Sequence, residues 1–238
     1  MCAHYESPLS KAVLHKHFGI ELPSERAERD VWPGYKSTFI RRHPQFQANT
    51  NAGNNAGSEA GNNAGPVREA LLGGFGLIPH WSKDEKIARH TYNARSETVA
   101  EKPSFRDAWR RAQHCIVPVQ SFFEPDWRSG KAVPTRITLQ SGEPMGLAGL
   151  WALWRSPAGE AVHSFTLLTV NADAHPFMRQ FHKPLDEKRS VVILPPERYD
   201  DWLQASSHES AAFLQAWPAE ALACEAPTSE FLGQGSLI

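Results

Sequence analysis

The feature that most restricts the fold is a series of short segments rich in β-branched and aromatic residues in the second half of the chain. Such residues suit the pleated surface of a β-strand. The turn Ser141-Gly142-Glu143 predicts a hairpin between the third and the fourth of these segments. We therefore expect an α+β protein with a mainly antiparallel, barrel-like β-sheet surrounded by helices. The predicted strands are Cys115 to Val119, Gln120 to Asp126, Thr135 to Leu139, Met145 to Trp154, His163 to Val170 and Ser190 to Leu194.

Helix start and stop signals predict helices around this sheet. Ser7 and Ser104 are the expected N-caps of the first two, because Pro8 follows Ser7 and Asp107 stands three residues after Ser104. Gly19 is the expected stop of the first helix. The predicted helical ranges are Pro8 to Phe18, Ser104 to Ala112, Pro196 to Gln204 and Ser207 to Ala216.

The chain of 238 residues is expected to form a single domain, residues 1–238. Asn49 to Gly65 reads NTNAGNNAGSEAGNNAG and has no large apolar side chain to bury, so it is interpreted as a disordered insertion within that domain. Lys and Arg number 25 against 26 Asp and Glu. This balance excludes a protein that binds polyanions through bulk charge, but it allows a local basic groove.

Cysteine usage indicates a reducing compartment, so the expected location is the cytoplasm. The chain has 3 cysteines, an odd number that leaves at least one thiol free. The first residues, MCAHYESPLSKAV, lack the pattern of a secretory signal, and we expect the mature chain to start at or next to Met1. Cys2, His4, Cys115 and Cys224 lack the spacing of a zinc site, so neither a metal nor another cofactor is expected.

Cys2 is the first candidate for chemistry, because removal of Met1 would leave an amine and a thiol on the same residue. Reference pKa values for such an amine and thiol, about 8 and about 8.5, lie close to neutral pH. An aminothiol of this kind condenses with an aldehyde to an imine, which the sulfur then closes to a thiazolidine ring. The alternative is that Cys2 is an ordinary buried or surface thiol.

Other polar residues stand where the strand and helix patterns do not need them. Asn93 and Arg95 are two residues apart on an extended segment, so both side chains can face one cleft and bind a phosphate or carbonyl. Glu124 follows two aromatics in an apolar strand and would suit a general acid or base. His182 could transfer protons near neutral pH. The alternatives are a surface turn for Asn93 and Arg95, a solvent-facing Glu124 and a structural His182.

In this order, these clusters resemble the SOS response-associated peptidase (SRAP) domain family of abasic-site processing proteins. The resemblance covers nearly the whole chain, and it depends on the order and spacing of several short segments. These are Met1-Cys2, Val31 to Gly34, Gly74 to Trp81, Asn93 to Thr98, Cys115 to Pro118, Phe122 to Glu124, Phe165 to Asp173, and His182 with Val191 to Pro195.

The resemblance implies that the chain binds single-stranded DNA and captures the ring-opened aldehyde of an abasic site as a thiazolidine DNA–protein crosslink. Cys2 would be the nucleophile and Glu124 a general acid and base. His182 would assist sugar ring opening and proton transfer, and Asn93 would orient the N-terminal residue or the sugar. In the family, the residues that match Cys2, Glu124 and His182 are credited with removing the N-terminal residue, which is Met1 here. Lyase activity is a further implication.

The resemblance also implies a DNA path and a monomeric protein without a membrane partner. This chain differs from the family at two single positions. It has His4 where the family usually has Arg, and Pro125 where the family usually has Trp. The Asn49 to Gly65 insertion and Lys183 to Arg189 also differ. The residues expected along the DNA are Arg95 at a phosphate, Trp81, Pro33 and Thr169 beside it, and His4 as a weaker or pH-dependent phosphate contact.

Two other functions use the same residues. A thiol peptidase acting on other proteins would use Cys2 as nucleophile and His182 as base, and would cleave peptides without DNA. A non-covalent single-strand-binding module would use Arg95 and Trp81, and would bind equally well with or without an aldehyde.

Overall fold

The computed structural model describes residues 2–21, 27–44 and 68–225 of the chain. The predicted insertion from Asn49 to Gly65 lies outside the described residues. None of the helices in the described ranges is long and apolar enough to cross a membrane.

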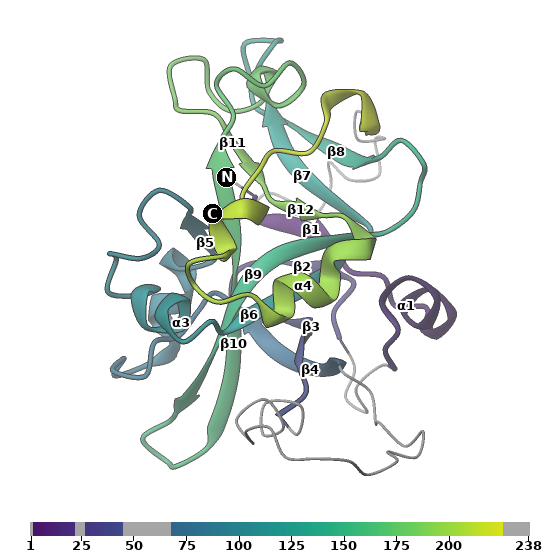
Figure 1. Ribbon diagram of the computed structural model, residues 1–238. Coiled ribbons are helices and arrows are strands. Elements are labelled where there is room, and N and C mark those ends of the chain that lie inside the picture. The colour runs from purple at the N-terminus through teal and green to yellow at the C-terminus, as the bar shows by residue number, and fades with distance from the viewer. Residues whose placement is uncertain (1, 22–26, 45–67, 226–238) are drawn as a thin grey trace.

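The centre of the molecule is a closed β-barrel (Figure 1). Its strands follow each other around the ring in the order β10, β4, β3, β6 and β9, and β9 pairs with β10 to close it. The pairing of β10 with β4 is parallel, and the other pairings in the ring are antiparallel. The prediction of a mainly antiparallel barrel is confirmed. The strands are β3 (Lys36–Arg42), β4 (Arg68–Phe75), β6 (His114–Val119), β9 (Met145–Arg155) and β10 (Ala161–Asn171).

Short strands extend this sheet. β11 (Arg189–Val191) pairs with β10, and β12 (Ile193–Leu194) pairs with β9. β5 (Asn93–Arg95) runs parallel to β10 just beyond the point where β4 leaves it, with Thr169 opposite Arg95. β10 therefore fixes the positions of both candidate residues on β5.

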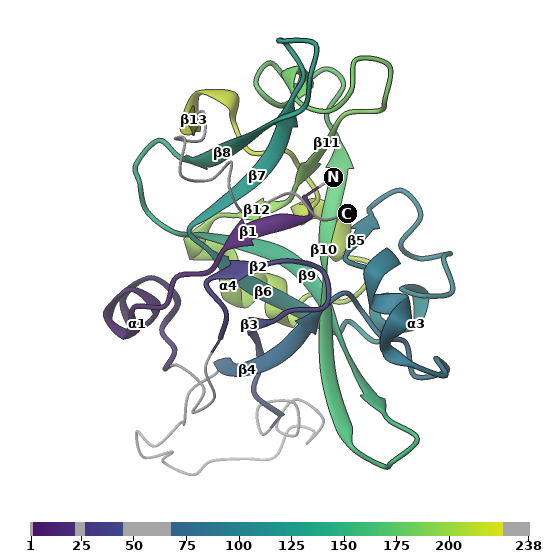
Figure 2. The same cartoon turned by 180° about the vertical axis from the view of Figure 1, so that it is seen from behind.

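A second sheet has the strand order β13, β8, β7, β1 and β2, and Figure 2 shows β1 beside β7 and β2. The predicted hairpin around Gly142 is wrong, because β8 pairs with β7 and β13 whereas β9 belongs to the barrel. Gly142 does form a turn, donating from its N–H to the Leu139 carbonyl, but the chain crosses there from one sheet to the other. The strands are β1 (His4–Glu6), β2 (Asp30–Val31), β7 (Ser121–Asp126), β8 (Val133–Leu139) and β13 (Leu222–Glu225).

The predicted N-caps of the first two helices are wrong. α1 (Lys11–Phe18) is capped by Ser10, because the N–H of Ser7 pairs with the Arg29 carbonyl and keeps the preceding chain extended. Its end at Gly19 is as predicted, with φ of 66°. α3 (Arg106–Arg110) begins after Phe105 without a side-chain cap, since the preceding backbone is already turned.

Near the C-terminus, α4 (Tyr199–Gln204) follows a 3-10 turn, η3 (Pro196–Arg198), as predicted. The predicted helix from Ser207 to Ala216 shortens to a 3-10 turn, η4 (Ser210–Phe213). In Figure 1, α1 and α3 lie on opposite sides of the barrel. The remaining 3-10 turns are η1 (Glu85–His90), η2 (Met178–Gln180) and η5 (Ala219–Ala221).

The barrel strands contribute to two hydrophobic clusters. Neighbouring residues of β6 point to opposite faces of the strand and so belong to different clusters. Val117 packs in the cluster that contains Cys2, and Ile116 packs in the cluster under α1 and α4. Trp202 of α4 is fully buried and donates from Nε1 to the Cys115 carbonyl at 2.9 Å. The helices are thus attached to the outside of the barrel, and Cys2 lies in the core between the barrel and the second sheet.

We expect Gly76→Ala to lower the free energy of unfolding by about 3 kcal/mol or more. Gly76 has a φ of 122°, and a Cβ there would lie 2.1 Å from the Ala88 carbonyl oxygen. Gly74, two residues earlier, has no atom within 4 Å of such a Cβ. Gly74→Ala is the matched control and should change stability by less than about 1 kcal/mol. Denaturant unfolding measures both, and equal losses would contradict the packing described for Gly76.

Candidate active site

Cys2 is completely buried at the point where the two sheets meet. The pairing of β1 with β7 places His4 opposite Phe123, so Cys2 lies toward the Pro125 end of β7. Its thiol donates to the His4 carbonyl at 3.5 Å. From the barrel side, Asn93 donates from Nδ2 to the Cys2 carbonyl at 2.7 Å. The backbone carbonyl of Cys2 is therefore held from the barrel side, and its thiol is bonded to β1 of the second sheet.

The environment of Cys2 keeps the thiol protonated. Burial raises the pKa of the thiol well above its ordinary range, and the negative charge of Glu124 raises it further. The reference thiol pKa of about 8.5 therefore does not describe Cys2 in this buried state. A reaction of the sulfur must remove its proton as the new bond forms.

Glu124 and His182 form a buried pair next to Cys2. His182 Nε2 lies 3.0 Å from Glu124 Oε2, and the side chains are 9% and 1% exposed. The backbone N–H of His182 donates to the Pro125 carbonyl at 2.9 Å. His182 has a φ of 66°, which is unusual for a residue other than Gly and suggests that its position serves a function.

Tyr92 is a member of this group that the sequence did not single out. Burial raises the pKa of its phenol, and nearby Cys2 and Glu124 raise it further. The ring packs against Phe75 with centroids 5.8 Å apart. Its place directly before Asn93 on an extended segment was the only sequence signal for it. The structure thus brings Cys2, Asn93, Glu124 and His182 together, with Tyr92 beside them.

His4 has its ring between two aromatic side chains. Trp32 stacks on one face with a centroid distance of 4.1 Å, and Phe123 on the other at 4.2 Å. Nε2 lies 3.1 Å from Asp30 Oδ1. Burial lowers the pKa of His4, although Asp30 opposes the shift. His4 is therefore engaged by Asp30, and the exposed Trp32 presents an aromatic surface beside His4 that the sequence reasoning missed.

The other residues expected along the DNA differ in exposure. Trp81 is exposed, and its Nε1 lies 3.4 Å from the Pro103 carbonyl. Pro33 is partly buried. Thr169 is buried, and its backbone carbonyl accepts a hydrogen bond from Arg189 Nη2 at 2.7 Å. The structure places Thr169 beneath the surface that carries Arg95, and the contacts of these residues with DNA stay a prediction.

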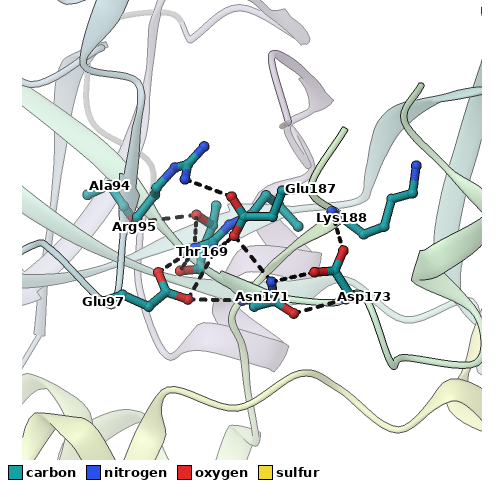
Figure 3. A network of polar contacts seen from close by, with 9 residues as sticks. Ala94, Arg95, Glu97, Thr169, Asn171, Asp173, Glu187 and Lys188 are labelled. Atoms are coloured by element: carbon teal, nitrogen blue, oxygen red, sulfur yellow. Dashed lines mark hydrogen bonds and ion pairs between the residues drawn. The ribbon is translucent and has the colours of Figure 1, made fainter. Parts of the chain in front are cut away.

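Arg95 lies at the edge of a charged network that the sequence did not reveal (Figure 3). Its Nη1 is 2.7 Å from Glu187 Oε2. Glu187 also contacts Arg189, which is 2% exposed and forms two further hydrogen bonds with Glu97. Within the described residues, no group of three or more His, Cys, Asp or Glu side chains could hold a metal ion.

Comparison with known proteins gives a family match over most of the chain. Residues 1–230 match the family model described as SOS response associated peptidase (SRAP). "Abasic site processing protein YoqW" of Bacillus subtilis is 38% identical over 130 residues, 54% of each chain. "Abasic site processing protein HMCES" of Rattus norvegicus is 27% identical over 129 residues, 41% of this chain and 36% of that protein. The chain thus matches the Bacillus relative over about half the length of each.

Solved structures share the fold. A crystal structure of a protein from Bordetella bronchiseptica is 42% identical, with a TM-score of 0.81 over 95% of this chain and 100% of that one. A second, from Bacteroides thetaiotaomicron, is 21% identical, with a TM-score of 0.73 over 98% of this chain and 95% of that one. The arrangement of barrel and second sheet is therefore shared by proteins of diverged sequence.

We expect the cysteines of the native protein to differ strongly in their rate of alkylation by iodoacetamide. Cys224 is exposed, whereas Cys2 and Cys115 are buried and burial raises the pKa of both thiols. Because the thiolate is the reacting form, Cys224 should react faster than the other two by a factor on the order of 10². Peptide mass mapping after a timed reaction measures this, with guanidinium-unfolded protein as the control in which the rates converge. A native Cys2 as reactive as Cys224 would contradict its burial.

Proposed function

Because the chain belongs to the SOS response associated peptidase (SRAP) family, we propose that it processes abasic sites in DNA and that Cys2 forms a covalent bond with them. The names of the curated relatives support the choice of lesion. The observation that carries the proposal is the convergence of Asn93 and the Glu124–His182 pair on the N-terminal Cys2.

The proposed reaction begins with the Cys2 amine. Hydrolysis of the Met1–Cys2 peptide bond frees this amine, and the family name supports such a peptidase step. The amine adds to the aldehyde carbon of the ring-opened abasic sugar, and one water leaves to give an imine. The sulfur then adds to the imine carbon while its proton passes to the imine nitrogen, which closes the thiazolidine ring. The hydrolysis consumes one water and releases methionine, the condensation with the aldehyde loses one water, and no step involves an oxidant.

Glu124 is the residue we assign to the proton transfers. Its charge acts on the Cys2 thiol, which still carries its proton. Glu124 would accept this proton as the C–S bond forms and deliver it to the imine nitrogen. His182 contacts Glu124 at 3.0 Å and would pass protons between it and the sugar oxygen. Asn93, through its bond to the Cys2 carbonyl, would hold the amine in place for attack.

Single-stranded DNA is the proposed form of the substrate. Arg95 would bind a backbone phosphate, and the exposed rings of Trp32 and Trp81 would stack on bases. A duplex would have to expose the sugar carbon before it could reach a buried Cys2, which favours an unpaired lesion. We propose that one chain is sufficient, since each named residue of the reaction comes from the same chain.

The two alternative functions explain fewer of these contacts. A peptidase acting on other proteins would need its thiol accessible and ionised, whereas Cys2 is buried and its pKa is raised. A non-covalent binding module gives no role to the buried Glu124–His182 pair or to the bond from Asn93 to Cys2.

The proposal predicts a heat-stable adduct between the protein and a single-stranded oligonucleotide that carries one abasic site. A denaturing gel detects the adduct, and its intact mass should equal the oligonucleotide plus the protein without Met1, less one water. Cys2→Ala should abolish the adduct and Cys2→Ser nearly so, because a hydroxyl closes the ring poorly. Cys224→Ala removes an exposed thiol elsewhere and should crosslink at the wild-type rate. A full-strength adduct from Cys2→Ala would refute the assignment of the nucleophile.

A second pair of variants separates chemistry from binding. Glu124→Gln should slow crosslinking by a factor on the order of 10², the usual contribution of a positioned acid or base, and leave binding of an undamaged strand intact. Arg95→Ala should weaken that binding and reduce the slope of log affinity against log salt by roughly 0.7, the value for one phosphate contact on a single strand. Crosslinking time courses and fluorescence anisotropy measure the two effects. Equal losses of rate and affinity in Glu124→Gln would instead give Glu124 a structural role.

A further inference from the structure

We propose that Glu187 limits the affinity of the protein for the phosphate backbone of single-stranded DNA by pairing with Arg95. This inference rests on the proposed function, in which Arg95 binds a phosphate. It assigns to Glu187 an effect that is opposite in sign to that of Arg95.

The Arg95–Glu187 contact lies at the surface. The two side chains meet at 2.7 Å between Nη1 and Oε2 and are 48% and 34% exposed. In the described part of the chain, this is the one ion pair found for Arg95. A phosphate oxygen and a carboxylate oxygen are acceptors of the same kind for a guanidinium group. Glu187 therefore neutralises the charge that a phosphate would need.

Glu187 does not depend on Arg95 for its position. Its other oxygen, Oε1, accepts from Arg189 Nη1 at 2.7 Å. The same oxygen accepts from Asn171 Nδ2 at 3.2 Å, as Figure 3 shows. Arg189 is buried and held in turn by Glu97. The Arg189 hydrogen bond lowers the pKa of Glu187, so its carboxylate is charged at neutral pH. The buried Arg189 thus anchors a carboxylate whose second oxygen faces Arg95.

The size of the expected effect follows from the exposure of the pair. Exposed ion pairs contribute little, and the loss of one corresponds to a change in affinity of no more than about fivefold. A phosphate can therefore replace Glu187 at Arg95, but it does so against this competition. The resulting decrease in affinity applies equally to damaged and undamaged strands. Selection of the abasic site is then left to the reaction at Cys2.

A different role for Glu187 would be to orient Arg95 toward the phosphate. The two roles predict opposite results when the carboxylate is replaced by an amide. Glu187→Gln removes the charge but keeps an oxygen that can accept from Arg189, so the buried network can stay intact. Competition predicts tighter binding of DNA by this variant, and orientation predicts weaker binding.

The experiment is fluorescence anisotropy of the full chain with an undamaged single-stranded oligonucleotide at several salt concentrations. Glu187→Gln should bind about two- to fivefold more tightly than wild type at low salt, and the gain should shrink as salt screens the charges. Asp186→Asn removes the same charge from the neighbouring exposed position, for which no ion pair is found among the described residues, and should change affinity by less than about 1.5-fold. In an Arg95→Ala background, Glu187→Gln should give no gain.

Four results would overturn the inference: weaker binding by Glu187→Gln, unchanged binding by Glu187→Gln, an equal gain from Asp186→Asn, or a gain that persists without Arg95. Thermal unfolding checks that the variants are folded. If Glu187→Gln is unstable, Glu187→Asp is the second variant, because its shorter side chain keeps a carboxylate for Arg189 and draws it back from Arg95. It should also bind more tightly. A wild type that crosslinks abasic DNA while Glu187→Gln shows no gain refutes this inference alone, whereas a wild type that binds no single strand refutes the proposed function as well.

Discussion

The pairing of β1 with β7 is the constraint on which the rest of the site depends. N-terminal residues usually fray unless a sheet holds them, and here His4 lies opposite Phe123 in the middle of the second sheet. Cys2 is thereby carried into the core next to Glu124, where Asn93 reaches its carbonyl from the barrel. Asn93 is itself placed by the pairing of β5 with β10. The site therefore depends on two strand registers, that of β1 on β7 and that of β5 on β10.

The same constraint explains how the chain accommodates its departures from the family pattern. At position 4, the flat imidazole ring fits between Trp32 and Phe123 and bonds to Asp30. At position 125, Pro has no N–H, but the bond made there uses its carbonyl, which accepts from the backbone of His182. With His4 and Pro125 in place, Glu124 and His182 lie 3.0 Å apart. Both differences therefore fall on the surroundings of this pair.

Sequence patterns predicted the barrel because its strands are bounded segments of β-branched and aromatic residues, but they did not predict which strands pair. The turn at Gly142 has the composition of a hairpin, yet its flanking strands join different sheets, since pairing is decided by contacts distant in the chain. Pro8 favoured Ser7 as the cap of the first helix, but the Ser7 N–H is bonded to the distant Arg29 carbonyl and the Ser10 hydroxyl caps the helix. Cys2, Asn93, Glu124 and His182 were named from their order along the chain, whereas Tyr92 and the pairing of Arg95 with Glu187 carry no local pattern.

The burial of Cys2 has a chemical consequence for the proposed reaction. A protonated, inaccessible thiol reacts poorly with electrophiles that approach from solution, so Cys2 is protected from alkylation and oxidation. The proposed ring closure would differ, because the imine carbon would already be attached to the nitrogen of the same residue and the sulfur would attack within one molecule. Such proximity raises the effective concentration of the reacting group by many orders of magnitude. Burial therefore suppresses unwanted reactions of the thiol far more than it slows the closure that follows imine formation, and an electrophile that first engages the amine is favoured over all others.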